Sequence, residues 1–232
     1  MFLYAACPVE RELMKISRLT TLVVALAFCS FASADIINYG DFEADNVTFI
    51  DVTEISLEDG ALYGAPDVVG DTLDLPATGF ISESVNGEID FLDGRLSFMV
   101  EAAPGNTINS ITLEEFGAYF TFGEESIASV GAIAFVETLE GGLFTDEFQF
   151  TFDGSNGPDS GGWIESLTIS FPETSKITVT LDNQLFTFAD DPGVAFIDKK
   201  GVNISVGLVV PEPTSSVLIL MGLAGLAYRR RR

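Results

Sequence analysis

Carboxylates are the residues of this chain with the most obvious capacity for chemistry. The 232 residues include 35 Asp and Glu but no His, which excludes Ser-His-Asp and Cys-His nucleophiles and most zinc sites. The remaining catalytic option is a pair of carboxyl groups about 5 to 9.5 Å apart that acts on a glycosidic bond. Because so many acids will produce some such pair by chance, we predict that the protein is not an enzyme. A glycan-active enzyme with a carboxylate pair stays an alternative.

Three acidic doublets stand out, but their spacing does not suit a carboxylate pair. They are Glu114-Glu115, Glu124-Glu125 and Asp190-Asp191. Neighbouring residues of a strand point to opposite faces, so the two carboxyl groups of one doublet cannot act together. We predict that the doublets are solubilising surface or edge charge, which also discourages pairing between strand edges.

The loop DGSNGPDSGG groups oxygen atoms of the kind that calcium prefers. Its candidate ligands are Asp153, Ser155, Asn156 and Asp159. The loop departs from the EF-hand pattern, because Pro158 stands where glycine is needed and Ile164 stands where a bidentate glutamate is needed. Calcium is therefore a candidate cofactor, and a turn-rich loop that needs no ion is the alternative.

Trp163 is the single tryptophan and the candidate for stacking on a sugar ring. It follows Gly161-Gly162 and could lie at a loop edge with its indole exposed. The other interpretation is a core anchor at the start of a strand. The first interpretation predicts a carbohydrate-binding module of lectin-like type, which is an alternative function for this protein.

The charges are unevenly distributed along the chain. Seven of the 11 basic residues lie at the two ends, and the segment from Asp35 to Leu208 has four basic residues against 32 acidic ones. Such a field repels nucleic acid and anionic membrane surfaces and attracts cations. We therefore exclude nucleic acid as a partner and take divalent cations as candidate partners.

Alternation with period two predicts strands throughout this segment. No window between Asp35 and Leu208 holds a long apolar stripe at helical spacing. In ITVTLDNQLFTF, the alternation of Ile177, Val179 and Leu181 predicts a strand, and Asp182-Asn183 is a turn signal. We therefore predict a hairpin whose return strand follows Asn183.

The body at 35–208 is predicted to be all-β, an antiparallel β-sandwich with a jelly roll as one form of it. In EFQFTFDG, three phenylalanines share one face before a turn at Asp153-Gly154. Further predicted strands are Val47–Leu57, Gly79–Val85, Arg95–Ala102, Ile108–Leu113, Ala118–Phe122, Ile127–Thr138, Trp163–Phe171, Gly193–Ile197 and Val202–Leu208. We expect inward-facing phenylalanines to form the core between the two sheets.

Residues 1–34 have the pattern of a secretory signal peptide. Lys15 and Arg18 precede the apolar run Leu19–Phe31, and a small-residue cleavage site with Ala32 and Ala34 follows. Met14 is the predicted start, with an extended basic region as the alternative. Both cysteines of the chain precede the cut, so the exported body contains none and depends on its core rather than on disulfides.

The C-terminal segment 209–232 combines a proline-rich motif, an apolar stretch and a basic end. Residues 214–228 would form a helix of about 22 Å, a marginal transmembrane anchor. Four consecutive arginines follow it, namely Arg229, Arg230, Arg231 and Arg232. We predict that this basic tail holds the C-terminal end in the cytoplasm, with the acidic body outside.

The segment VPEP, a Ser/Thr spacer, an apolar stretch with small residues and terminal arginines resemble the PEP-CTERM sorting signal of Gram-negative bacteria. The resemblance covers about 23 residues and leaves the body's activity open. It implies that exosortase, a membrane transpeptidase or protease, recognises Pro211, Glu212 and Pro213. It further implies an inner-membrane intermediate and then a place at the cell surface or in the extracellular matrix. With exopolysaccharide as an expected partner, we predict a non-enzymatic surface or biofilm-matrix protein.

A second processing motif lies inside the body. The segment Leu75–Gly79 matches the sortase pattern LPxTG, but no apolar segment and basic tail follow it closely. We predict that it is a loop leading into a strand.

Overall fold

The computed structural model describes residues 35–58 and 60–210, which form 12 strands and, within these ranges, no helix. The strands are β1 (Asp35–Glu43), β2 (Val47–Ser56), β3 (Asp67–Val69), β4 (Thr72–Leu75), β5 (Ile81–Val85), β6 (Ile89–Ala102), β7 (Thr107–Phe122), β8 (Ile127–Thr138), β9 (Leu143–Asp153), β10 (Asp159–Thr174), β11 (Lys176–Phe188) and β12 (Val194–Val209). The all-β prediction is confirmed.

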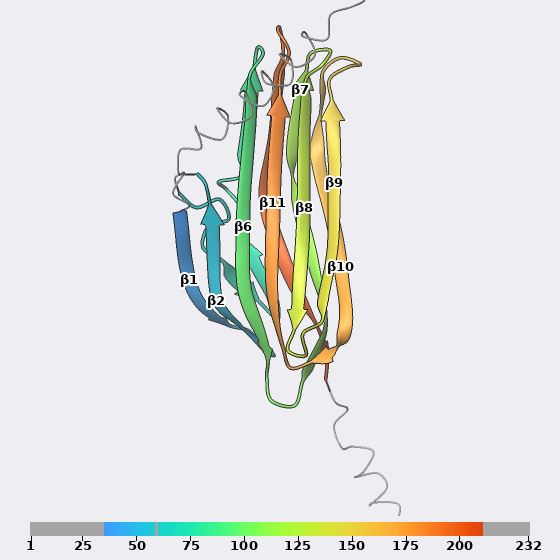
Figure 1. The fold of residues 1–232 in the computed structure, drawn as a ribbon. Helices are drawn as coiled ribbons and strands as arrows, with labels where there is room; N and C mark the ends of the chain where they lie inside the picture. The colour runs from blue at the N-terminus through green and yellow to red at the C-terminus, as the bar shows by residue number, and fades with distance from the viewer. Residues whose placement is uncertain (1–34, 59, 211–232) are drawn as a thin grey trace, which may run out of the picture. The chain divides into compact units, whose positions relative to one another are not determined.

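The strands form two antiparallel sheets that pack as a sandwich. Sheet A has the order β1-β2-β6-β11-β8-β9, and its long strands lie in the front of Figure 1. Sheet B has the order β10-β7-β12-β4-β3, and β5 also pairs with β12. Burying one face of each sheet against the other is what an alternating apolar pattern requires.

The last eight strands have the connectivity of a jelly roll. Strands β8 and β9 pair, as do β7 and β10, β6 and β11, and β5 and β12. This is one long hairpin, with β8 and β9 at its tip, rolled so that successive pairs fall alternately in sheet A and sheet B. The jelly-roll form of the sandwich prediction is therefore confirmed, with β1 to β4 extending the two sheets.

Alternate residues of each long strand fill the core. In β11, each second residue from Ile177 to Thr187 is buried, and β8 alternates in the same way over most of its length. The predicted aromatic core is found, since Phe49, Phe80 and Phe98 are buried. Other phenylalanines face outward instead, because strand parity rather than hydrophobicity alone sets the direction of a side chain.

The hairpin predicted at Asp182-Asn183 is wrong. Strand β11 continues through both residues and pairs along its length with β6 on one side and β8 on the other. The two polar side chains are satisfied by partners distant in sequence, since Asp182 pairs with Arg95 and Asn183 bonds to Tyr63. A turn signal is overridden where both neighbouring strands offer backbone partners.

Several predicted strands are parts of longer ones. The predicted strands Ile108–Leu113 and Ala118–Phe122 are both within β7, and Val202–Leu208 and all of Gly193–Ile197 except Gly193 belong to β12. A register shift between Lys199 and Gly201 interrupts the pairing of β12 with β7 without ending the strand. Bulges of this kind break the period of two, which is why β12 is mistaken for two strands.

Leu75 of the sortase-like segment ends β4, and the rest of the segment is part of a loop that leads into β5, as predicted. Ala77 is fully buried and has a φ of 49°. Its N–H donates to the carbonyl of Tyr63 at 2.7 Å, and the N–H of Gly79 donates to the carbonyl of Leu62 at 3.0 Å. The backbone of this segment therefore takes part in the hydrogen bonding of the folded body.

Candidate functional site

A groove of about 620 Å³ lies on the outer face of sheet A. It is built mainly from the outward-facing residues of β6, β11, β8 and β9, which lie side by side in Figure 1. Its lining residues are Phe91, Ser129, Gly131, Ala132, Ile133, Glu147, Phe148, Gln149, Asp182, Gln184 and Phe186. Because the groove is concave and brings polar and aromatic side chains together, we take it as the candidate site.

Cross-strand register arranges these side chains in three rows across the strands. The first row is Arg95, Asp182, Ile133 and Glu147. The second row is Asp93, Gln184, Gly131 and Gln149. The third row is Phe91, Phe186, Ser129 and Thr151. Directly opposed side chains are about 5 Å apart, so each row is a continuous surface.

Gly131 creates the hollow in the middle row. It lies between Gln184 and Gln149 and has no side chain to fill the space between them. A Cβ atom added there would meet its nearest neighbour, the carbonyl oxygen of Phe148, at 3.6 Å, an ordinary contact. The sheet itself would therefore accept a larger residue at 131, and the groove depends on glycine being there.

One end of the groove is aromatic and its middle is polar. Phe91 is 50% exposed and opposes Phe186 on the neighbouring strand. The amide groups of Gln184 and Gln149 can each donate and accept hydrogen bonds. Aromatic faces beside neutral amides suit a ligand that has both apolar C–H faces and hydroxyl groups.

An ion pair borders the other end of the groove. Arg95 donates from Nε to Asp182 Oδ1 at 2.6 Å and from Nη2 to Asp182 Oδ2 at 2.9 Å. This hydrogen-bonded pairing raises the pKa of Arg95. A second hollow of about 190 Å³, lined in part by Ile55, Leu57 and Asp93, shares this ion pair. The two hollows together extend from β2 to β9.

The groove suits binding better than acid-base catalysis. Its two lining carboxylates, Asp182 and Glu147, are in one row on either side of Ile133. Their strands are two spacings apart, which separates their Cα atoms by about 9 to 10 Å. Both oxygens of Asp182 are occupied by Arg95, so only Glu147 of this row offers a free carboxylate.

The predicted calcium ligands have protein partners in the structure. Asp153 Oδ1 accepts hydrogen bonds from the N–H and the hydroxyl of Ser155, which lower the pKa of Asp153. Asp159 Oδ2 accepts a hydrogen bond from Tyr119 Oη at 3.3 Å, and Asn156 Nδ2 donates to Ser155 Oγ. Among the described residues, no group of three or more His, Cys, Asp or Glu forms that could hold a metal ion. A calcium site at Asp153, Asn156 and Asp159 stays a prediction.

Trp163 is in the core and not at a loop edge. Only 7% of it is exposed, and its ring packs edge-on against Phe150 with 5.6 Å between centroids. Its Nε1 donates to the carbonyl of Asp198 at 3.2 Å. A buried indole has no free face for a sugar, so sugar stacking by Trp163 is not supported and the core-anchor interpretation accounts for this residue.

The surface prediction is wrong for one member of the acidic doublets. Glu115 is fully buried and accepts a hydrogen bond from Lys199 Nζ at 2.5 Å. Because neighbours in β7 alternate in direction, Glu115 faces the core while Glu114 does not. A basic partner in the adjacent strand, invisible in the local sequence, makes this burial possible.

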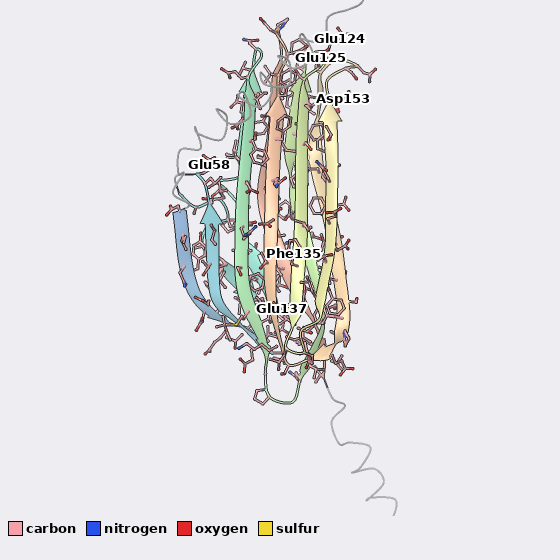
Figure 2. All side chains as sticks on the ribbon, in the orientation of Figure 1. Glu58, Glu124, Glu125, Phe135, Glu137 and Asp153 are labelled. Carbon is pink, nitrogen blue, oxygen red and sulfur yellow. The ribbon has the colours of Figure 1, made fainter. Side chains whose placement is uncertain are left out.

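The other doublets lie at one end of the sandwich. Glu124 and Glu125 are exposed in the turn between β7 and β8, near the top of Figure 2. Asp190 instead joins the loop after β11 to the turn between β7 and β8. It accepts hydrogen bonds from Ser126 Oγ at 2.7 Å and from the N–H of Glu125 at 3.2 Å. The bond from Ser126 lowers the pKa of Asp190.

Sequence reasoning missed the groove residues because the turn assignment hid them. Once β11 is taken as one strand, the same alternation that buries Leu181 and Leu185 places Asp182, Gln184 and Phe186 on the outer face. The lone outward Gly131 in a strand otherwise rich in larger residues is the second signal. Their assembly with Phe91 and Gln149 depends on which strands pair.

Residues 209–232 match the family model of the PEP-CTERM protein-sorting motif. The chain ends in a PEP-CTERM motif. A motif of this kind indicates an exported protein that exosortase processes, and it confirms the resemblance seen in the sequence.

The chain has a weak similarity to several solved structures. One similar structure is TmCBM61 in complex with β-1,4-galactotriose, with a TM-score of 0.24 and 15% identity over 57% of this chain and 81% of that chain. Another is the CBM22-1 xylan-binding domain of Paenibacillus barcinonensis Xyn10C, with a TM-score of 0.22 and 9% identity over 75% and 94%. Scores this low support no conclusion about ligand or activity. No curated protein matches the chain.

The residues of the two processing signals lie outside the described ranges, 35–58 and 60–210. The structure therefore does not place the predicted cleavage residues Ala32 and Ala34. Neither does it place the motif and tail residues Pro211, Glu212, Pro213, Arg229, Arg230, Arg231 and Arg232. The cytoplasmic placement of the four arginines and the cleavage at Ala34 stay predictions. In the part of the chain that the structure describes, no helix is long and apolar enough to cross a membrane.

Proposed function

We propose that the chain is an exported surface or matrix protein that exosortase sorts and that has no catalytic activity of its own. The observation that carries the proposal is the sorting motif at residues 209–232. The prolines of PEP fix φ and remove backbone donors, so they would present Glu212 on a stiff extended segment that a membrane enzyme can read. The signal at residues 1–34 would bring the chain to the membrane, with cleavage after Ala34.

The charge distribution supports an exported body whose two end segments serve export and sorting. The arginines that follow the apolar stretch would keep the C-terminal end in the cytoplasm until processing. The acidic body would then be released outside, where it repels nucleic acid and anionic lipid but attracts cations. Divalent cations could bridge this surface to acidic exopolysaccharide.

Mass spectrometry of the native C-terminus tests the sorting. In a cell that has exosortase, the mature protein should lack all four arginines of the tail, Arg229–Arg232. Glu212→Ala should leave the tail in place, whereas Glu88→Ala, an exposed acid of the body, should not affect processing. A mature surface protein with its arginine tail intact would contradict the proposal.

A second candidate function is glycan binding by the groove of sheet A. The groove joins the exposed ring of Phe91 and the neighbouring Phe186 to the amides of Gln184 and Gln149. Its charged lining residues are Glu147 and the paired Asp182, and Asp93 lines the neighbouring hollow, so a neutral glycan fits it better than an acidic one. The low similarity to carbohydrate-binding modules contributes nothing to this argument.

Affinity electrophoresis in gels that contain neutral polysaccharides tests the groove. We expect wild type to be retarded by at least one of them and Gly131→Leu to run freely, because the leucine fills the hollow while the fold persists. Phe91→Ala should weaken retardation. Phe120→Ala is the matched control, since Phe120 is an exposed phenylalanine of sheet B. Equal retardation of Gly131→Leu and wild type would place any binding elsewhere.

A further inference from the structure

Three polar side chains meet in the interior between the two sheets. Lys199 comes from β12 and Glu115 from β7, both in sheet B, and Asn183 comes from β11 in sheet A. All three are buried, and both members of the ion pair have fully buried side chains. Lys199 Nζ contacts Glu115 Oε2 at 2.5 Å and is in direct contact with Asn183 Oδ1.

The arrangement is unusual for a buried ion pair that serves stability alone. Such a pair offsets its desolvation only when the remaining lone pairs are also hydrogen-bonded. Glu115 Oε1 is buried and has no hydrogen-bond partner. This free oxygen belongs to the carboxylate that contacts Lys199, so it can take up and release a proton within the cluster.

The amide of Asn183 is held in one orientation. Its Nδ2 donates to Tyr63 Oη at 3.0 Å, and Tyr63 Oη donates in turn to the carbonyl of Gly94 at 3.0 Å. The amide oxygen therefore faces Lys199. Because the amide carbon Cγ is one bond of about 1.2 Å from that oxygen, the amine lies within reach of the carbon.

Aromatic rings pack against the cluster. Lys199 Nζ is 5.2 Å from the centroid of Phe80, and the rings of Phe80 and Tyr63 pack edge to face at 4.8 Å. Burial lowers the pKa of Lys199, although Glu115 opposes this effect. When the shared proton is on Glu115, Lys199 is a neutral amine with a free lone pair, which is the nucleophilic form.

We propose that Lys199 and Asn183 form an intramolecular isopeptide bond across the two sheets, with Glu115 as the group that transfers the protons. The site is a modification site in the body itself, so it is independent of the sorting and of the groove. It would give an exported domain without cysteines a covalent link between its sheets.

The step balances without any oxidant or cofactor. Lys199 Nζ attacks Asn183 Cγ, and the C–N bond to the lysine forms while Glu115 donates its proton to the amide oxygen. Glu115 then takes the excess proton from the lysine nitrogen and delivers it to Nδ2. The bond between Cγ and Nδ2 breaks, the amide nitrogen leaves as ammonia, and the proton on the oxygen returns to Glu115 as the carbonyl forms again. The products are one secondary amide and one ammonia molecule, and Glu115 returns to its starting state.

Peptide mapping of the full-length chain tests the bond directly. Cleavage before aspartates under denaturing conditions separates Asn183 from Lys199, because Asp190 and Asp191 lie between them. We expect the peptide that begins at Asp182 to stay joined to the peptide that carries Lys199, at a mass about 17 Da below their sum, the mass of ammonia. Separate peptides of ordinary mass would overturn the proposal. Separate peptides with the mass loss confined to that of Asn183 would also overturn it, because they would show cyclisation of the asparagine alone.

Variants test the roles of the residues. Glu115→Gln should retain both bonding partners but reduce the joined fraction at least tenfold, and Lys199→Met should abolish it. Lys200→Met, a change of the neighbouring exposed lysine, should leave the joined fraction at the wild-type level. Cooperative urea unfolding checks that each variant is folded. If Glu115→Gln does not fold, the wild-type peptide map still decides the question, and a folded Glu115→Gln with wild-type joining would remove Glu115 from the mechanism.

Discussion

Replacement of Glu54 by alanine should strongly destabilise the body, although Glu54 is outside both candidate sites. Glu54 is fully buried at the end of β2. Its carboxylate accepts hydrogen bonds from the backbone N–H groups of Leu62 and Tyr63, and Tyr39 Oη donates to it at 2.6 Å. The carboxylate thus holds the segment between β2 and β3 against the core.

The expected cost follows from the donors that lose their acceptor. Leu62 and Tyr63 are 4% and 0% exposed, so water cannot replace the carboxylate without opening the segment. Two orphaned buried donors at roughly 1 to 3 kcal/mol each lower the free energy of unfolding by about 2 to 6 kcal/mol. With a urea m-value of about 2 kcal/mol/M, the midpoint should fall by roughly 1 to 3 M.

Urea unfolding followed by circular dichroism and by tryptophan fluorescence measures the effect. Glu58→Ala is the matched control, since Glu58 follows the same strand, is exposed and is visible at that end of β2 in Figure 2. Its free energy of unfolding should stay within about 0.5 kcal/mol of wild type. If Glu54→Ala shifts the midpoint no more than Glu58→Ala does, the carboxylate does not organise this segment.

Three further predictions concern pH, salt and calcium. Burial and the Glu54 carboxylate raise the pKa of Tyr39, so the folded state favours the protonated phenol. The free energy of unfolding should therefore be retained below about pH 10 and should fall as the pH rises further. This fall should be less steep in Tyr39→Phe. The ion pair of Arg95 and Asp182 is half-exposed at the arginine, so Arg95→Ala should cost at most about 1 kcal/mol in urea unfolding, and less at high salt. If the loop at Asp153 binds calcium, millimolar calcium should raise the thermal midpoint of wild type but not of Asp153→Asn; an unmoved midpoint would reject the site.

Residue patterns alone were enough to predict the fold class. Period-two alternation, the absence of helical stripes and the spacing of turn residues predict a β-sandwich, and Ile127–Thr138 matches β8 residue for residue. Local patterns suffice here because a strand with one buried face must alternate. The strands β1, β3 and β4 were missed because they are short or largely exposed and carry little alternation.

The tertiary structure decided what the polar residues do. Glu115 and Asn183 look like surface charge and a turn in isolation, yet both are in the core, and burial decides between the two interpretations of Trp163 in favour of the core anchor. Their burial depends on Lys199, Tyr63 and the Asp198 carbonyl, which come from other parts of the chain. No window of sequence contains both members of such a pair.

The sequence by itself determined that this protein carries a sorting motif, because such a motif is recognised as a linear segment and does not depend on the fold. It also determined that the body is acidic, free of cysteine and built from strands. Only the tertiary structure decided which carboxylates are exposed to solvent and which is buried in an ion pair with a lysine. It brought Gly131 between two glutamines and Lys199 against Asn183. The reason is physical: sheet pairing and face-to-face packing join residues that are distant along the chain, and chemistry depends on those distances.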